Sequence, residues 1–387
     1  MKTPVVLLVV VALLGIAAFA ASQYLLLFTR DSVVDQAAYL GNRSNPADIY
    51  DRPSTGALYS PLSVAVDPMD RLMLVDIADD PDYIAIEMQV FDDVRGQGAR
   101  VILYHKEGPA DFYCTSEAVA DVADSDAVPT VQDLKYHFEV TGSGLDAGLK
   151  MTDREGKPVE FTVKEASRQE ASKGFLAPIG GGTAITFDAF PFFHMKGMEF
   201  VPREGSEIAI KVDGHDRTPA QIAIPVNWKF VYRTRYTTDP ILGFWNKARE
   251  GELPPLQPGK LLTYQDGRTR YDLVDNAGHR EIRRMIGSSD KHSVSFEFAP
   301  AIPDLPDVRD GIELDGRFSL GADDVLGIVA GEYHIQRHGG TIEMQILPQE
   351  GWQPMPGTTW VKSWAWHGTI VVGKDDAVSM RAMWVRQ

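Results

Sequence analysis

The chain has 387 residues, of which 44% are hydrophobic and 24% are charged, a composition typical of a folded globular protein. Its 38 basic and 54 acidic residues give a net charge of −16, which excludes a nucleic-acid-binding surface because phosphate contacts need a basic stripe. The single cysteine, Cys114, excludes an internal disulfide and any metal site built on several cysteines, and we expect its thiol to be buried and inert.

The N-terminus carries a long apolar segment. No charge occurs between Lys2 and Arg30, and residues 5–21 consist of apolar residues alone. A cleaved signal peptide and an uncleaved membrane anchor both fit, but a signal peptide's apolar region spans only about 7–15 residues. We therefore favour a transmembrane helix within residues 1–30. Lys2 precedes the span, which places the body of the protein in the periplasm or outside the cell.

Beyond residue 36 the hydrophobic pattern has a period of two. Apolar and polar residues alternate in segments 83–90, 135–140, 207–212 and 294–298. This alternation is typical of strands with one buried face.

Turn signals separate these strands. The sequence predicts one hairpin around residues 153–158 and a tighter one around His338-Gly339-Gly340. Strands recur without intervening amphipathic helices, so we expect an all-β fold with antiparallel sheets in a sandwich or a barrel. Barrels with aromatic interiors commonly hold one apolar ligand, as lipocalins do, and the analogy concerns the fold only.

Residues 239–259 interrupt the strand pattern. We interpret 239–250 as a short helix that leads into a segment with three prolines, at positions 254, 255 and 258. This linker divides the body into an N-terminal β-domain, residues 36–238, and a C-terminal β-domain, residues 260–387.

Catalytic and cofactor motifs are absent from the sequence. It contains no P-loop, no GxSxG elbow and no HExxH zinc motif. Aspartates crowd residues 76–82, where a calcium site and a solvated turn are the alternatives, and we favour the turn. We therefore predict no cofactor and no metal.

Two residues form a candidate acid/base pair. On a strand over residues 332–337, Glu332 and His334 point to the same side, and Glu332 could orient the imidazole. Glu343 and Gln345 on the partner strand would complete a polar panel. A solvated outer face of a sheet is the alternative.

Aromatic side chains mark two further segments. Trp360, Trp364 and Trp366 share one strand face, and His367 lies on the other. His194 belongs to a segment with four phenylalanines, residues 187–195. The tryptophan face forms either the core of the C-terminal domain or the wall of a ligand pocket.

These features lead to one main hypothesis and two alternatives. We expect a membrane-anchored cell-envelope β-protein that binds a hydrophobic small molecule or lipid through Trp360, Trp364, Trp366, His367 and His194. The alternatives are an enzyme of hydratase or isomerase type, with His334 and Glu332 as its catalytic pair, and an interaction ectodomain without a pocket.

Overall fold

The computed structural model describes residues 36–93, 96–116, 129–142, 144–166, 175–177, 190–223, 225–226, 228–245, 249–256, 269–322, 328–352, 364–373 and 377–386. The predicted N-terminal anchor, residues 1–30, lies outside them. No helix in the described part of the chain has the length and apolar character needed to cross a bilayer. Apart from the short helix α2 (Gln36–Leu40) and the 3-10 turns η1 (Ala47–Ile49) and η2 (Leu305–Asp307), the regular elements are strands.

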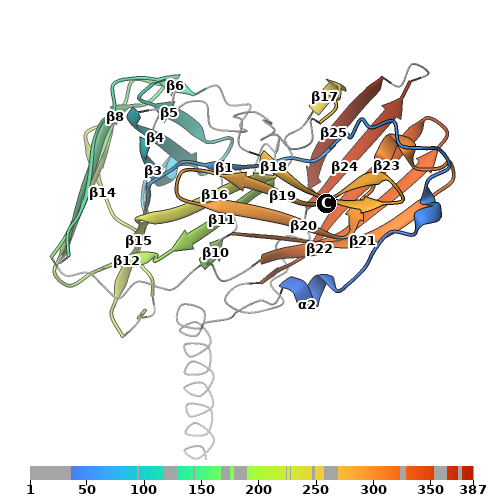
Figure 1. Ribbon diagram of the computed structural model, residues 1–387. Coiled ribbons are helices and arrows are strands. Elements are labelled where there is room, and N and C mark those ends of the chain that lie inside the picture. Colours follow the sequence, from blue (N-terminus) through green and yellow to red (C-terminus); the bar gives the residue numbers. More distant parts are fainter. Residues whose placement is uncertain are drawn as a thin grey trace, which may run out of the picture.

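Two sheets pack face to face at the left of Figure 1. The first has the order β12-β15-β2-β3-β4-β5-β6. Its strands are β2 (Arg71–Asp76), β3 (Tyr83–Asp93), β4 (Gly96–His105), β5 (Asp111–Cys114), β6 (Thr130–Val131), β12 (Glu199–Pro202) and β15 (Val231–Thr237). The second has the order β14-β13-β9-β8-β7. Its strands are β7 (Lys135–Val140), β8 (Leu145–Thr152), β9 (Pro158–Glu165), β13 (Ser206–Val212) and β14 (His215–Arg217).

A large antiparallel sheet forms the other half of the molecule, at the right of Figure 1. Its order is β17-β25-β24-β23-β22-β21-β20-β19-β18. The strands are β17 (Arg249–Glu252), β18 (Thr269–Asn276), β19 (His279–Ser288), β20 (Ser293–Ile302), β21 (Glu313–Ala322), β22 (Ile328–His338), β23 (Thr341–Trp352), β24 (Trp364–Val372) and β25 (Val378–Arg386). A smaller sheet, with the order β1-β16-β11-β10, shares its core. The strands of this smaller sheet are β1 (Val64–Asp67), β10 (Phe175–Ala177), β11 (Phe190–Lys196) and β16 (Asp239–Trp245).

The all-β prediction is confirmed. Strands predicted over 83–90, 135–140, 207–212 and 294–298 lie within β3, β7, β13 and β20. Both predicted hairpins form: Thr152 pairs with Pro158, and His338 pairs with Thr341. The barrel alternative is wrong for the described strands, because each of the four sheets is an open sequence of strands that does not return on itself. The lipocalin analogy is therefore not supported.

The predicted helix over residues 239–250 is wrong, because residues 239–245 form β16 and residues 249–252 form β17. The packing of Trp245 favours a strand here instead of the predicted helix. Its fully buried indole packs edge-on against Phe296, Phe318 and Trp384, with ring centroids 4.1, 4.9 and 5.0 Å apart. Strands β1 and β11 flank β16 and hydrogen-bond to its backbone. These non-local partners outweigh the local preference of a short segment.

Residues 36–66 precede the strands of the sandwich in the sequence but lie against the large sheet. Leu58, Leu62, Val64 and Val66 are buried in the core of that sheet. The division of the body into two domains at 239–259 stays a prediction. Helix α2 lies against β21, and the Tyr39 hydroxyl donates to the Gly331 carbonyl oxygen on the neighbouring strand β22 at 3.3 Å. Residues 36–66 thus line one side of the C-terminal half (Figure 1).

Candidate metal centre

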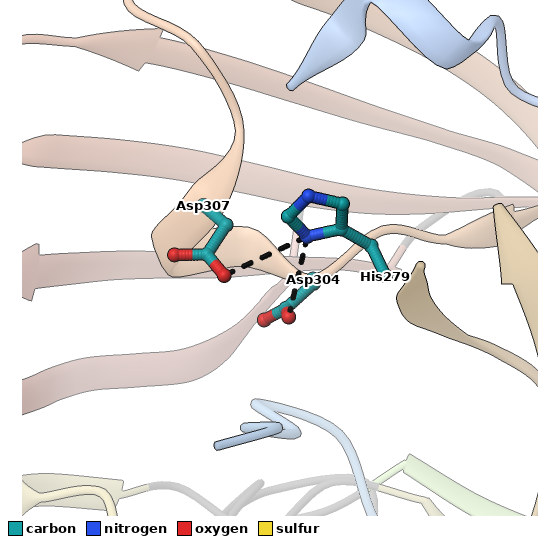
Figure 2. Close-up of side chains that lie close together, drawn as sticks. All are labelled: His279, Asp304 and Asp307. Atoms are coloured by element: carbon teal, nitrogen blue, oxygen red, sulfur yellow. Dashed lines mark ion pairs between the residues drawn. The ribbon is translucent and has the colours of Figure 1, made fainter. Parts of the chain in front are cut away.

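Three buried side chains, His279, Asp304 and Asp307, converge beside the large sheet (Figure 2). His279 begins β19 directly after a two-residue turn, in which Ala277 and Gly278 have φ values of 55° and 87°. A turn with two positive φ angles is the usual tight connection between twisted antiparallel strands. Asp304 and Asp307 lie just beyond β20, at the two ends of the turn η2. The exposed fractions of the three side chains are 3%, 2% and 0%.

The imidazole Nδ1 of His279 faces both carboxylates. It lies 3.8 Å from Asp304 Oδ2 and 3.6 Å from Asp307 Oδ2. Neither Nδ1 nor Asp304 Oδ1 has a hydrogen-bond partner, although both atoms are buried. Unpaired buried polar atoms are rare and costly, so this arrangement calls for a charged or hydrogen-bonding occupant.

The backbone of residue 52 sets the tautomer of His279. Nε2 lies 3.0 Å from the carbonyl oxygen of Arg52. A carbonyl oxygen only accepts, so Nε2 carries the proton and donates it. In the neutral ring, Nδ1 is then left with its lone pair aimed at Asp304 and Asp307. A backbone carbonyl behind one ring nitrogen is the usual outer support of a metal-binding histidine.

Further contacts hold each member of the cluster in place. The Tyr50 ring stacks on the His279 ring, with centroids 3.7 Å apart and planes 8° from parallel. The Tyr50 hydroxyl accepts from the Asp304 backbone N–H at 3.1 Å. Asp307 accepts from Arg52 Nε at 2.6 Å and from the Thr55 backbone N–H at 3.0 Å. The ligand atoms are therefore oriented by segments 50–55, 279 and 304–307 together.

Acidic side chains outnumber basic ones at the cluster, where Asp304, Asp307 and Glu281 lie beside Arg52 and Arg337. Burial, reinforced by the neighbouring charge of Asp307, raises the pKa of the Asp304 carboxyl to about 7, and Arg52 offsets only part of this rise. Glu281, two residues after His279 on β19, adds a third buried carboxylate. The Glu281 side chain accepts from the Tyr50 hydroxyl at 2.9 Å and from Asn276 Nδ2 at 2.8 Å.

A pocket of about 350 Å³ opens beside Glu281. Polar residues of the segment after α2, including Arg43 and Asn45, line it together with Arg283 and Glu297. Asn45 Nδ2 also donates to Glu281 Oε2 at 3.1 Å. Through Glu281 and Tyr50, hydrogen bonds thus connect the pocket to the cluster.

The donor set fits a divalent cation that accepts nitrogen and oxygen ligands. Zn²⁺ binds histidine nitrogen and carboxylate oxygen at about 2.0–2.2 Å, so adjacent ligand atoms in a tetrahedral site lie about 3.4 Å apart. The separations of 3.6 and 3.8 Å from His279 Nδ1 are close to this value, and the three ligand atoms all lie within 4.8 Å of one another, so the side chains would move inward to bind the ion. Calcium takes six to eight oxygen ligands, which this cluster does not supply.

The predicted acid/base pair is arranged differently from the expectation. His334 does hydrogen-bond to a carboxylate, but the partner of its Nδ1 is Asp315 on β21. The His334 and Asp315 side chains are 41% and 78% exposed, and Glu332 is exposed as well. Gln345 lies opposite His334, as the predicted polar panel requires. Their catalytic role stays a prediction.

The predicted ligand-binding residues are scattered. Trp364 and Trp366 are buried in the core of the large sheet, while His367 points to the opposite face and is half-buried. His194 lies in β11 opposite Ile241, and its side chain is outside the described part of the structure, as is the whole of Trp360. The pocket beside Glu281 is lined by none of these residues. Binding of a hydrophobic ligand through them stays a prediction.

Two smaller expectations concern Cys114 and the aspartate-rich turn. Cys114 is buried. In the aspartate-rich turn, Asp80 caps the backbone N–H groups of Asp82 and Tyr83 and accepts from Arg217 Nε at 2.6 Å. Asp76 accepts from Arg235 at 2.6 Å. These carboxylates are engaged by the protein itself, but Asp76 and Asp80 are buried, so at these positions the turn is not solvated as expected.

Sequence reasoning missed the cluster entirely. The three residues have no metal-ligand spacing, because His279 is 25 positions before Asp304. The two residues meet because β19 and β20 pair as an antiparallel hairpin, with His279 at the start of β19 and Asp304 just after β20. The one available signal was the pair of aspartates in Asp304-Leu305-Pro306-Asp307, a short apolar turn in which carboxylates are unexpected.

Comparison with known proteins adds no family. The chain matches no protein-family model, no curated protein and no solved structure at a significant level. Its function must therefore be argued from its own residues.

Proposed function

We propose that this chain is a metal-binding protein that holds a divalent cation between His279, Asp304 and Asp307. Among divalent cations, we expect Zn²⁺. The supporting observation is the unpaired, buried Nδ1 of His279, which faces two carboxylate oxygens 3.6 and 3.8 Å away. The cation would replace the missing hydrogen-bond partner and neutralise the excess negative charge.

The role supported best is structural. The three side chains are almost completely buried and therefore out of reach of a substrate. Three protein ligands leave open the fourth position of a tetrahedral zinc site, which a water molecule would fill. The ion would join η2 to the β18–β19 hairpin, and the contacts of Arg52 would attach the N-terminal segment to both. In this proposal the body lies in the periplasm or outside the cell, behind the membrane segment expected in residues 1–30.

Metal analysis of the purified full chain tests the proposal. The chain is stripped with a chelator, incubated with Zn²⁺, Mn²⁺ or Ca²⁺, and freed of loosely bound ions before its metal content is measured. We expect about one Zn²⁺ per chain, little retained Ca²⁺, and a rise in unfolding free energy of about 2.7 kcal/mol at a hundredfold excess over Kd. Weak surface binding would not survive the washing step.

Matched variants locate the site. His279→Gln and Asp304→Asn should abolish retention of the ion. His334→Gln, which removes the exposed histidine paired with Asp315, should retain as much Zn²⁺ as the wild type. The proposal is wrong if the wild-type chain retains no divalent ion, or if Asp304→Asn, whose side chain keeps its shape, retains the ion unchanged.

A further inference from the structure

An aromatic turn projects from the sandwich half. Just before β15 the backbone N–H of Val226 donates to the Lys229 carbonyl at 2.9 Å, and the N–H of Lys229 donates back at 3.0 Å, which closes a tight turn. Trp228 in this turn is 88% exposed, and Phe230 after it is 54% exposed. They are the two most exposed large hydrophobic side chains in the described part of the chain.

The backbone at Trp228 is unfavourable as well. Its φ of 64° is in the left-handed region, where a bulky residue is a true outlier. A polar residue or glycine would suit an exposed left-handed position better. Neither the left-handed backbone of Trp228 nor the exposure of its side chain stabilises the folded chain by itself. A partner surface that buries the indole would account for both.

Basic side chains accompany the two aromatic ones. Lys229 is exposed between them, and the guanidinium of Arg203 lies 5.9 Å from the centre of the Phe230 ring. Glu204 follows Arg203, so these three charged residues sum to +1 in a chain whose net charge is −16. Tryptophan with a neighbouring lysine or arginine is typical of protein segments at the membrane–water interface.

The position of the turn agrees with such a surface. In Figure 1 the yellow-green segment that precedes β15 projects toward the lower edge, the side on which α2 lies. Helix α2 is the first described element, and the segment expected to span the membrane ends near residue 30. The intervening residues 31–35 reach at most about 18 Å, so a bilayer on this side would lie close to α2.

We propose that Trp228 and Phe230 insert into the interfacial region of a phospholipid bilayer, with Lys229 at the anionic headgroups. The turn would then give the anchored body a second attachment to the membrane and fix its orientation. This inference is independent of the metal site, because the turn shares no residue with it.

Quenching by brominated phospholipid tests the insertion. The full chain is reconstituted into vesicles of phosphatidylcholine and phosphatidylglycerol, with and without bromine on the acyl chains. Trp245, Trp364, Trp366 and Trp384 are buried in the protein, so the difference between wild type and Trp228→Phe reports on the turn. We expect this difference emission to lose most of its intensity in brominated vesicles and to resist aqueous iodide.

A relocated tryptophan provides the control. Val131 is 50% exposed on β6, at the opposite, upper edge of Figure 1. In the double variant Trp228→Phe with Val131→Trp, the new indole should be quenched by iodide and not by brominated lipid. Lys229→Gln should weaken lipid quenching about fivefold on anionic vesicles and leave it unchanged on neutral ones.

Several outcomes would overturn the inference. Trp228 could stay accessible to iodide on the vesicles, as it would if its real partner were another protein. The full chain could also fail to associate with the vesicles. Because Trp228→Phe changes only an exposed side chain, its unfolding midpoint should match the wild type, which separates loss of insertion from loss of fold.

Discussion

His279 and Arg52 are 227 residues apart in the sequence, yet Nε2 of the imidazole donates to the Arg52 carbonyl oxygen at 3.0 Å. This contact decides which ring nitrogen carries the proton and leaves the unprotonated Nδ1 toward the acidic residues. The side chain of the same arginine neutralises Asp307 at 2.6 Å. One residue of the N-terminal segment therefore sets both the tautomer and the charge of the candidate metal centre.

The first prediction concerns pH. The folded-state pKa of Asp304, about 7, is above the value of about 3.9 in an unfolded chain, so the folded protein holds its proton more tightly. The stability that Asp304 contributes to the metal-free protein is therefore complete below pH ~4 and is lost as the pH rises toward ~7. Urea unfolding of wild type and Asp304→Asn across this pH range gives the free energy of unfolding of each. The wild-type value minus the variant value should fall by a few kcal/mol as the pH rises.

Zinc should reverse this dependence. Metal binding needs the ionised carboxylate, so the zinc-induced stabilisation should grow as the pH rises to about 7 and then level off. The measurement is the same unfolding series with Zn²⁺ present. A zinc effect that is equal at pH 5 and pH 8 would contradict the assignment of Asp304 as a ligand.

The second prediction separates a core tryptophan from the wall of a ligand pocket. Trp366 is fully buried among the side chains of the large sheet. Trp366→Ala should lower the free energy of unfolding by about 3–5 kcal/mol, because it leaves a cavity in a packed core. Trp366→Phe should cost less, since the Trp366 Nε1 has no hydrogen-bond partner to lose. A near-neutral Trp366→Ala would instead favour an open ligand site.

The third prediction uses a close approach between two strands. Gly316 on β21 lies opposite Tyr333 on β22, and a Cβ at position 316 would come within 2.2 Å of the tyrosine ring. The hydroxyl of that ring donates to the Pro300 carbonyl at 2.7 Å, so the ring has little freedom to move away. Gly316→Ala should destabilise the protein by about 1–3 kcal/mol.

A second glycine serves as its control. Gly142 has open space around the position of a Cβ atom. Gly142→Ala should be neutral or slightly stabilising, by up to about 1 kcal/mol. Thermal or urea unfolding measures both variants, and equal effects at the two positions would argue against the close contact with Tyr333.

The fourth prediction concerns the exposed His334–Asp315 pair. Both side chains are in contact with solvent, so their ion pair is screened. His334→Ala should change the free energy of unfolding by less than about 1 kcal/mol, the usual value for a surface pair. A loss above ~2 kcal/mol would mean that the polar panel on this face of the sheet has a partner that buries it.

Local patterns account for the strands that were predicted correctly. Alternating side chains over 83–90 or 294–298 suit a sheet with one buried face whatever the partner strand is. The tight turn at Gly339 needs only a residue that tolerates its φ of 58°. The segment 239–250 was misread because its strand character comes from the flanking strands β1, β11 and β25.

The candidate metal centre could not be found in the same way. His279, Asp304 and Arg52 are ordinary residues in their own segments, and nothing in their spacing indicates that they meet. The exposed Trp228 was equally hidden, because a tryptophan in an apolar segment is normally expected in a core.

The sequence alone thus determined that this chain is a β-protein, with strands and hairpins at specified residues, because alternation and turn geometry act over a few neighbouring residues. Its charge also excluded nucleic acid, since net charge needs no fold. Only the tertiary structure decided which sheets pack together, that β16 is a strand, and that His279 faces two buried carboxylates. Those outcomes depend on hydrogen bonds and burial between separate elements, 25 positions apart for His279 and Asp304 and 227 for His279 and Arg52, which no local pattern records.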